Sequence, residues 1–319
     1  MNDLGYVIGA DIGGGSARVA AVSPDGAVMK KIVVPSDPAS GYDALVKRVR
    51  AAMAGIISSR RKDPMAMCVA CAGAVDFGRN VIISSPNFPG WRDAPLADDL
   101  GKGYKFAVIL ENDANAAALG EGWTGAARGW PGFAMLTLGT GVGGGIVIDG
   151  AVFHGPNGMA GEVGHLPISQ AGLMCGCGRR GCLETTASAA GVARKAADIY
   201  HNPEAAALRR ASGGKPARVD ARMVARLAAR GDKACLGIMR QAGLELGEAM
   251  GSLCLALGIT RFVIGGGMAG AFDLLRAPMR KAALARAYTL NPRALRLAQA
   301  SLGDNAGLLG AARIAFTAL

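Results

Sequence analysis

The feature that most constrains the fold is a strand, glycine-rich turn and strand element that occurs twice in the chain. Residues 6–12 and 17–23 flank the first turn, GGGS, and a third strand at residues 27–34 follows the turn SPDG, which predicts an antiparallel meander. Residues 133–153 repeat this order with LGTGVGGG and a D-G turn. One such turn can simply join two strands, but two of them allow each of two lobes to offer backbone N–H groups to phosphate oxygens. The duplicated hairpin therefore favours a nucleotide-binding protein with a cleft between two lobes.

The length of the chain agrees with two lobes, because 319 residues exceed what one hydrophobic core usually fills. The sheet of the first lobe is expected to be mixed, since hydrophobic spacing places helices and buried strands after the meander. The expected elements are a helix over Tyr42–Ile57, strands within residues 65–73 and 106–110, an alanine-rich helix that follows Asn112 and Asp113, a long helix over residues 232–257, a strand at 261–267, and a final helix at 308–316 that folds back onto the first lobe. The remainder of the chain after Glu184 is expected to be largely helical, with the strand at 261–267 as its one strand.

Composition and charge exclude several classes of protein. The net charge of +11 comes from scattered Lys and Arg residues with no aromatic-interleaved basic run, so no nucleic-acid partner is expected. The N-terminal segment is acidic and glycine-broken, and the apolar stretches are interrupted, so we expect no signal peptide, no membrane partner and a cytoplasmic location. Seven cysteines in such a protein indicate thiols or metal ligands. Four of them are expected in the core, namely Cys68, Cys71, Cys235 and Cys254.

Two common nucleotide-binding motifs do not fit. LGTGVGG matches the dinucleotide fingerprint at Gly139, Gly141 and Gly144, but a β-branched segment follows where that site requires a helix. No G-x-x-x-x-G-K-[ST] string occurs, which excludes a P-loop enzyme.

Several strings together resemble the ROK family of sugar kinases and repressors. They are DIGGGSAR, LGTGVGGG, NDANAAALGE, GEVGH, CGCGRRGCLE, VIGGGMAG and LGDNAGLLGAA, and they cover nearly the whole chain in the family's order. The resemblance implies an α/β, actin-like or hexokinase-like (ribonuclease H-like) two-lobe fold with ATP in the cleft. We expect a small lobe of residues 1–112 plus 303–319 and a large lobe of residues 113–302, with a zinc-binding loop inserted at about 165–184.

The resemblance assigns the catalytic and nucleotide-binding residues. Asp113 matches the catalytic base, which must accept the proton of a sugar hydroxyl; alone, it would be read as the N-cap of its helix. Asp11 matches the phosphate-motif aspartate that would hold magnesium, through water; the alternative interpretation is a turn aspartate. The motif usually reads D-x-G-G-T, and Gly15 replaces the threonine here, with Ser16 as a candidate substitute. The expected ATP-binding residues are Asp11, Gly13, Gly14, Gly15, Ser16, Thr140, Gly141, Gly266 and Gly267.

Sugar recognition requires convergent donors and acceptors, since each ring hydroxyl both donates and accepts. The resemblance places Asn87, Asn112, Asp113, Glu162, His165 and Glu184 in this role. Glu162 and His165 are three residues apart, so one helical turn would present both on the same side.

A metal site is expected where three cysteines crowd together. Cys175, Cys177 and Cys182 with His165 give one nitrogen and three sulfur ligands, the set of a closed tetrahedral structural zinc site. The other interpretation is a group of free thiols. If one ring nitrogen of His165 binds zinc, the other can hydrogen-bond the sugar, so the metal would orient a substrate-reading ring.

The family contains kinases and repressors, and repressors carry a helix-turn-helix domain that we do not expect in front of Asp11. We therefore expect a glucokinase that transfers the γ-phosphate of ATP to the 6-hydroxyl of glucose, using Mg²⁺, with structural Zn²⁺. The open alternatives are an N-acetylglucosamine or N-acetylmannosamine kinase, other hexoses such as fructose or allose, polyphosphate as donor, and a sugar-binding protein without turnover. A homodimer is also expected, as in the family.

Overall fold

The computed structural model describes residues 5–319, which form two compact units. Unit 1 contains residues 5–131, 145–160 and 301–319, and unit 2 contains residues 132–144 and 161–300. These boundaries differ from the expected lobe boundaries, since residues 113–131, 145–160 and 301–302 group with unit 1.

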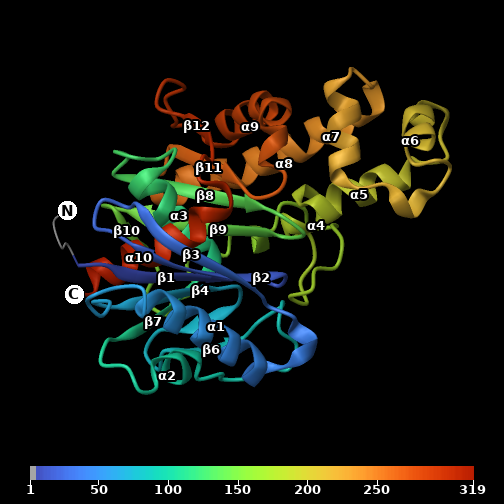
Figure 1. The fold of residues 1–319 in the computed structure, drawn as a ribbon. Helices are drawn as coiled ribbons and strands as arrows, with labels where there is room; N and C mark the ends of the chain where they lie inside the picture. Colours follow the sequence, from blue (N-terminus) through green and yellow to red (C-terminus); the bar gives the residue numbers. More distant parts are fainter. Residues whose placement is uncertain (1–4) are drawn as a thin grey trace. The chain divides into compact units, whose positions relative to one another are not determined.

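Unit 1 is built on a mixed five-stranded sheet in the order β3-β2-β1-β4-β7 (Figure 1). The strands β1 (Val7–Ile12), β2 (Ser16–Val22) and β3 (Val28–Pro35) form the antiparallel meander that the sequence predicts. The strand β4 (Met67–Cys71) pairs in parallel with both β1 and β7 (Val108–Asn112). The carboxyl ends of β1, β4 and β7 consequently lie along one edge of the sheet.

Successive side chains of each strand point to opposite faces of this sheet, and a hydrophobic cluster covers each face. Ile8 and Ile12 of β1 join a cluster with α1 (Tyr42–Ile57) and α2 (Leu96–Gly101). Val7 joins a second cluster, on the opposite face, with α3 (Asp113–Thr124) and α10 (Ala306–Thr317). The periodicity that predicted α1 is confirmed, because its apolar positions are buried against the sheet.

A close helix crossing explains why α3 belongs to unit 1. A Cβ atom at Gly310 of α10 would overlap the carbonyl oxygen of Ala116 on α3, so only glycine permits this approach. The buried carboxylate of Glu121 on α3 also accepts hydrogen bonds from the backbone N–H groups of Ser301 (2.9 Å) and Leu302 (2.8 Å). The C-terminal segment is therefore attached to α3 by packing and by a buried anion.

The second sheet repeats the strand order of the first. Its order is β10-β9-β8-β11-β12, from β8 (Gly132–Leu138), β9 (Val142–Ile148), β10 (Ala151–Val152), β11 (Arg261–Gly265) and β12 (Arg296–Gln299). The strand β11 pairs in parallel with β8 and β12. A glycine-turn meander followed by two parallel strands thus occurs twice, which confirms the predicted pseudo-repeat. A strand rather than a helix follows LGTGVGG, in agreement with the rejection of a dinucleotide site.

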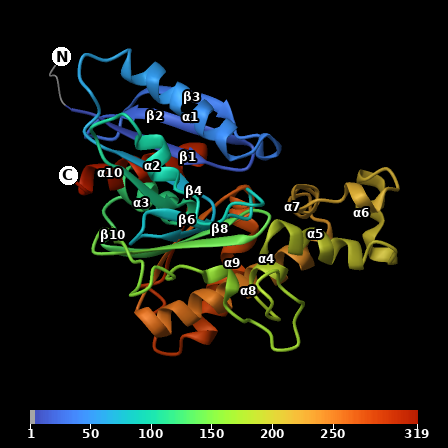
Figure 2. The same ribbon diagram turned by 90° about the horizontal axis from the view of Figure 1, so that it is seen from below.

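Two long helices of unit 2 pack through small residues. The helix α8 (Lys233–Leu257) carries Gly243, Gly247 and Gly251 at intervals of four residues, and a Cβ atom at each would press against α9 (Phe272–Arg286). The shorter helices of this unit are α4 (Glu184–Ala187), α5 (Ala189–Asp198), α6 (Ala206–Ala211) and α7 (Ala221–Ala229). The helix α7 packs against both α5 and α6 (Figure 2).

Three short strands were not predicted. The strands β5 (Ala74–Asp76) and β6 (Val81–Ser84) form a small hairpin. The expectation of a single strand after Glu184 is wrong, because β12 extends the sheet beside β11. The described part of the chain also contains six short 3₁₀ helices: Pro38–Ser40, Val163–His165, Pro203–Ala205, Pro216–Arg218, Ala269–Ala271 and Gly303–Asn305. Within residues 5–319, no helix combines the length and the hydropathy needed to cross a membrane.

Candidate active site and metal-ligand cluster

Two carboxylates of unit 1 lie at the strand edge. Asp11 is the fifth residue of β1, and Asp113 is the first residue of α3, directly after β7. Because β1 and β7 flank β4 in parallel, Asp11 and Asp113 are brought near each other at the carboxyl ends of their strands. The interpretation of Asp11 as a turn residue is wrong, since it lies within a strand.

The surroundings of Asp11 oppose its ionisation. Burial raises the pKa of Asp11 to about 6, and the nearby Asp113 and Asp304 act in the same direction. Arg18, opposite Asp11 in the β1–β2 register, opposes this rise with Nη1 at 3.6 Å from the carboxylate. Arg18 also donates through Nη2 to Asp304 at 3.0 Å. The charge on Asp11 is thus only partly balanced by protein groups.

The first glycine turn is open on one side. The backbone N–H of Gly13 donates to the carbonyl oxygen of Ser16 at 3.1 Å, which closes the turn. A Cβ atom at Gly14 would lie 3.3 Å from Cγ of Asn87, so the structure brings Asn87 to this turn. A Cβ atom at Gly15 would meet nothing within 4 Å. The Cβ atom of a threonine would therefore fit at Gly15 without displacing protein atoms.

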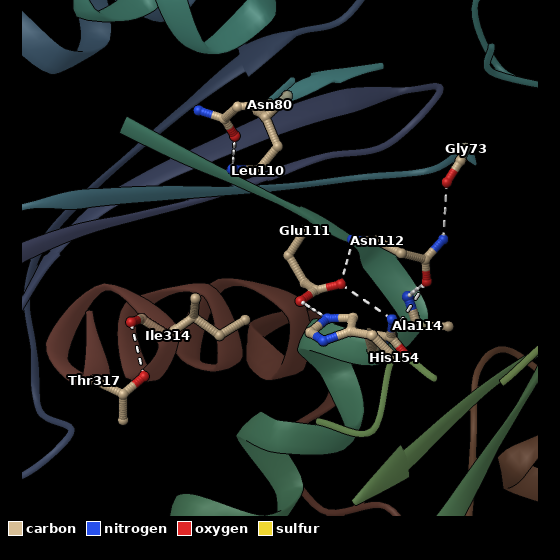
Figure 3. A network of polar contacts seen from close by, with 10 residues as sticks. Gly73, Asn80, Leu110, Glu111, Asn112, Ala114, His154, Ile314 and Thr317 are labelled. Atoms are coloured by element: carbon tan, nitrogen blue, oxygen red, sulfur yellow. Dashed lines mark hydrogen bonds and ion pairs between the residues drawn. The ribbon is translucent and has the colours of Figure 1, made fainter. Parts of the chain in front are cut away.

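Asn112, not Asp113, caps α3. Its Oδ1 accepts hydrogen bonds from the backbone N–H groups of Ala114 (2.9 Å) and Asn115 (3.2 Å), as Figure 3 shows for Ala114. Its Nδ2 donates to the carbonyl oxygen of Gly73 at 3.1 Å. Reading Asp113 as the N-cap is thus wrong. An amide nitrogen carries two hydrogens, so Asn112 retains one N–H for a ligand.

The residue before Asn112 forms a network that was not predicted. The buried Glu111 carboxylate accepts hydrogen bonds from Asn112 N at 2.8 Å and from Asn115 Nδ2 at 3.0 Å, and it pairs with Nε2 of His154 at 2.7 Å (Figure 3). The bond to Glu111 raises the pKa of His154. A carboxylate at the end of the apolar run VILE was a signal in the sequence, but its partner lies 43 residues away.

Four potential metal ligands gather in unit 2. One ligand atom from each of His165, Cys175, Cys177 and Cys182 lies within 4.8 Å of every other. Nδ1 of His165 is 3.6 Å from Sγ of Cys175, and Sγ of Cys177 is 3.6 Å from Sγ of Cys182. Two sulfurs bound at about 2.3 Å to a tetrahedral ion are about 3.7 Å apart, so the cluster fits zinc. Burial raises the pKa of Cys175 to about 12, and a bound cation is what would favour its thiolate.

The expected sugar-reading residues of unit 2 border this cluster. Nε2 of His165 is 3.8 Å from a carboxylate oxygen of Glu162, as the spacing of three residues predicted. Nδ1 of His165 is 3.7 Å from Oε1 of Glu184, which also accepts a hydrogen bond from Cys175 Sγ at 3.0 Å. One ring edge of His165 therefore faces the thiols while the other faces Glu162.

The second glycine turn lies against Glu184, which borders the metal-ligand cluster. A Cβ atom at Gly141 would lie 2.6 Å from Oε2 of Glu184, so the turn that includes Thr140 sits against that carboxylate. Gly266 has a φ of +79°, and its Cβ would lie 2.6 Å from the carbonyl oxygen of Leu138. The fold alone thus requires glycine at position 266. A Cβ at Gly267 would meet nothing within 4 Å.

The expected residues fall into two groups. In unit 1 the structure brings together the first glycine turn with Asn87, and Asp11 with Asp113, which Asn112 precedes. In unit 2 it brings together Gly141, Glu162, His165, Glu184 and the three cysteines. Arg18, Glu111, Asn115 and His154 complete the surroundings of the first group and were not predicted.

The chain is similar to known proteins over nearly its whole length, which includes both groups of residues. The model of the ROK family matches residues 7–318. A glucokinase from Halalkalibacterium halodurans is 37% identical over 319 residues, which cover 97% of this chain and 94% of the relative. The structure of a ROK family glucokinase from Streptomyces griseus in complex with glucose and AMPPNP has a TM-score of 0.81, with 32% identity, and covers 98% of this chain and 100% of its own. A ROK hexokinase from Thermus thermophilus has a TM-score of 0.83, with 33% identity over 98% of both chains.

Proposed function

The chain belongs to the ROK family, and on this premise we propose that it is an ATP-dependent glucokinase that phosphorylates the 6-hydroxyl of glucose. The observation that carries the proposal is the full-length likeness to the Streptomyces griseus glucokinase, whose structure contains glucose and AMPPNP. The duplicated strand order is that of the actin-like, hexokinase-like fold. We propose that units 1 and 2 are its two lobes.

Asp113 is the base in the proposed reaction. Its carboxylate accepts the proton of the 6-hydroxyl while that oxygen bonds to the γ-phosphorus and the bond from phosphorus to the ADP oxygen breaks. The position of Asp113 at the first turn of α3 supports this role, because Asn112 caps the helix and the backbone N–H of Ala114 donates to Oδ1 of Asp113 at 2.9 Å, which orients the carboxylate. The proton then passes from Asp113 to solvent.

The first glycine turn and Asp11 are proposed to face the phosphates. The backbone N–H groups of Gly14 and Gly15 suit phosphate oxygens, Gly13 closes the turn through its own N–H, and the hydroxyl of Ser16 takes the place of the missing threonine. Magnesium bound with ATP neutralises phosphate charge, and Asp11 would hold it through water. The like charges of Asp11 and Asp113 support this, since a cation near Asp11 would relieve their repulsion. Thr140, Gly141, Gly266 and Gly267 are proposed as the remaining ATP contacts.

Glucose recognition is proposed to rest on amide, carboxylate and imidazole side chains. Asn87 and Asn112 offer amide donors, and Glu162 and Glu184 offer carboxylates that accept bonds from ring hydroxyls. His165 supplies a ring nitrogen beside Glu162. The clustering of Glu162, His165 and Glu184 supports a set that closes round one ligand.

A structural zinc is part of the proposal. His165, Cys175, Cys177 and Cys182 would hold it as a closed four-ligand site, which contributes to folding rather than to the chemical step. Nδ1 of His165 lies 3.6 Å from Sγ of Cys175 while Nε2 lies 3.8 Å from Glu162, so a ring that binds zinc through Nδ1 would present Nε2 to the sugar. Reduced thiols support a cytoplasmic location, and a homodimer remains the expectation from the family.

The proposal is tested by ADP release from magnesium ATP with glucose, mannose, fructose, allose, N-acetylglucosamine or N-acetylmannosamine, and with no sugar. We expect turnover with glucose to exceed that with each other sugar, and polyphosphate to be a poor donor. Preference for an N-acetylated sugar would contradict glucose as substrate. Absence of turnover, with a sugar that still raises the Tm, would indicate a binding protein instead.

A further inference from the structure

A buried carboxylate lies beside the proposed base but takes no part in the proposed chemistry. The Glu111 side chain is 3% exposed and precedes the Asn112–Asp113 dipeptide at the end of β7. A buried charge is costly unless it is paired and hydrogen-bonded. The hydrogen-bond partners of Glu111 indicate why this carboxylate is buried beside Asp113.

The contacts of Glu111 enclose the turn that carries Asp113. Oε1 accepts from Asn112 N at 2.8 Å, on one side of Asp113 in the chain, and from Asn115 Nδ2 at 3.0 Å, on the other side (Figure 3). Oδ1 of Asn115 is buried with no hydrogen-bond partner within residues 5–319, so the orientation of this amide depends on Glu111. One carboxylate oxygen thus bridges the strand end and the first turn of α3.

The other oxygen of Glu111 is held from a distant segment. Nε2 of His154 lies 2.7 Å from Oε2, and the ring of Phe77 packs against the imidazole with centroids 4.2 Å apart. The carbonyl oxygen of His154 accepts a bond from Ala160 N at 3.0 Å, which closes the loop that precedes Glu162. His154 is therefore fixed by its ring contacts and by its own loop.

We propose that Glu111 and His154 are positioning residues for the phosphoryl transfer: Glu111 holds the strand-to-helix turn so that the Asp113 carboxylate meets the sugar hydroxyl, and His154 fixes Glu111. This inference rests on the proposed function. Neither residue touches substrate in this proposal. The pair acts through Asp113 and links its turn to the loop that leads to the sugar-reading residues Glu162 and His165.

The protonation state of His154 determines the strength of its interaction with Glu111. The bond to Glu111 raises the pKa of His154 above 6.5, so the ion pair is complete below that pH and is lost as pH rises through the folded-state pKa. Cys68 of β4 also faces Glu111, but burial raises its pKa well above the ordinary value, so it stays a neutral thiol. Phe77, whose ring packs against the imidazole of His154, carries no charge. Glu111 is thus the ionisable partner that faces His154.

The test compares steady-state kinetics of variants of the full chain. Glu111→Ala is expected to lower kcat about 10- to 100-fold with the Kd for glucose within about 3-fold, because a misplaced base costs rate rather than affinity. Glu111→Gln keeps the acceptor for Asn112 and Asn115 and can donate to neutral His154, so it should recover most of the lost rate. His201→Gln, which removes an exposed imidazole, is the control for His154→Gln.

The pH profile separates positioning from a merely structural role. Between pH 6 and 9, wild-type kcat is expected to fall as His154 loses its proton, and both Glu111→Gln and His154→Gln should lack this fall while His201→Gln keeps it. NMR of the imidazole protons should show a His154 pKa above 6.5 in the wild type, shifted down in Glu111→Gln.

The outcomes distinguish this inference from the proposed function. An inactive wild-type protein would overturn both. An active wild type and an inactive Asp113→Asn, with Glu111→Gln and His154→Gln unchanged in rate and pH profile, would overturn the inference alone. A Glu111→Ala protein with normal kcat per folded molecule would also overturn it, since Glu111 would then serve stability only.

Discussion

Replacing Asp11 by asparagine is expected to stabilise the magnesium-free protein. Burial, reinforced by Asp113, raises the pKa of Asp11 from 3.8 to about 6 in the folded protein. Since one unit of pKa difference corresponds to about 1.4 kcal/mol, ionising Asp11 in the folded state costs about 3 kcal/mol. Asparagine has nearly the same shape and carries no charge, so it avoids that cost.

The size of this effect depends on pH in a defined direction. Below pH 3.8 the carboxyl is protonated in both folded and unfolded chains, and the variant gains nothing. Between 3.8 and about 6 the folded protein retains a proton that the unfolded chain has released, so wild-type stability falls as pH rises. The gain should be about 1.6 kcal/mol at pH 5 and about 3 kcal/mol at pH 7 and above.

Thermal unfolding in magnesium-free buffer at pH 5 and pH 8 measures the effect. With an unfolding entropy of about 2 cal/mol/K per residue, about 3 kcal/mol corresponds to a rise in Tm of about 4 to 5 °C for cooperative unfolding. Asp304→Asn is the matched control, because its side chain is 85% exposed and pairs with the same Arg18; its Tm should change by less than about 1 °C. An Asp11→Asn protein that is less stable at pH 8, or equally stabilised at both pH values, would refute the reasoning.

Three further substitutions test the metal cluster and the glycine turns. Cys177→Ser should lower zinc content and Tm together, while Cys254→Ser, distant from the cluster in sequence, should retain zinc; full zinc occupancy of Cys177→Ser by metal analysis would exclude this ligand. Gly15→Thr should change the Tm by less than about 1 °C and keep or improve the KM for ATP, because its Cβ meets no atom within 4 Å; a large rise in KM would show that the turn has repacked. Gly266→Ala should destabilise the protein by about 1 to 3 kcal/mol in denaturant unfolding, because its φ is +79° and Leu138 O is 2.6 Å from the new Cβ, whereas Gly267→Ala should be close to neutral; equal effects would contradict this distinction.

The parts of the fold that the sequence predicted are those with strong local patterns. The apolar spacing within Tyr42–Ile57 and the glycine turns of both meanders depend on neighbours in the chain, and all three were recovered. The strand β12 was missed because RLAQ is short and has low β propensity, and its extended form comes from pairing with β11. The grouping of α3 with unit 1 depends on the contact between Gly310 and Ala116, which the sequence does not reveal.

The site shows the same division between local and distant information. The spacing of Glu162 and His165 predicted that they face each other, and the cysteine spacing predicted the metal-ligand cluster. Which of Asn112 and Asp113 caps α3 was not decidable, since both residue types are good caps. The pairing of Glu111 with His154 joins residues 43 positions apart in the chain, and the contact of His154 with Phe77 also joins residues far apart in sequence, so local patterns could not reveal either contact.

The central claim is that Asp113 removes the proton of the glucose 6-hydroxyl, and Asp113→Asn tests it most directly. Glucose affinity by calorimetry and glucose-dependent ADP release are measured on the same preparations of wild type and variant. We predict glucose affinity within about 3-fold of wild type and kcat lower by about 10² to 10⁴-fold, because the amide can hydrogen-bond to the sugar but cannot accept its proton. A variant that releases ADP at the wild-type rate would contradict the assignment of Asp113 as the base.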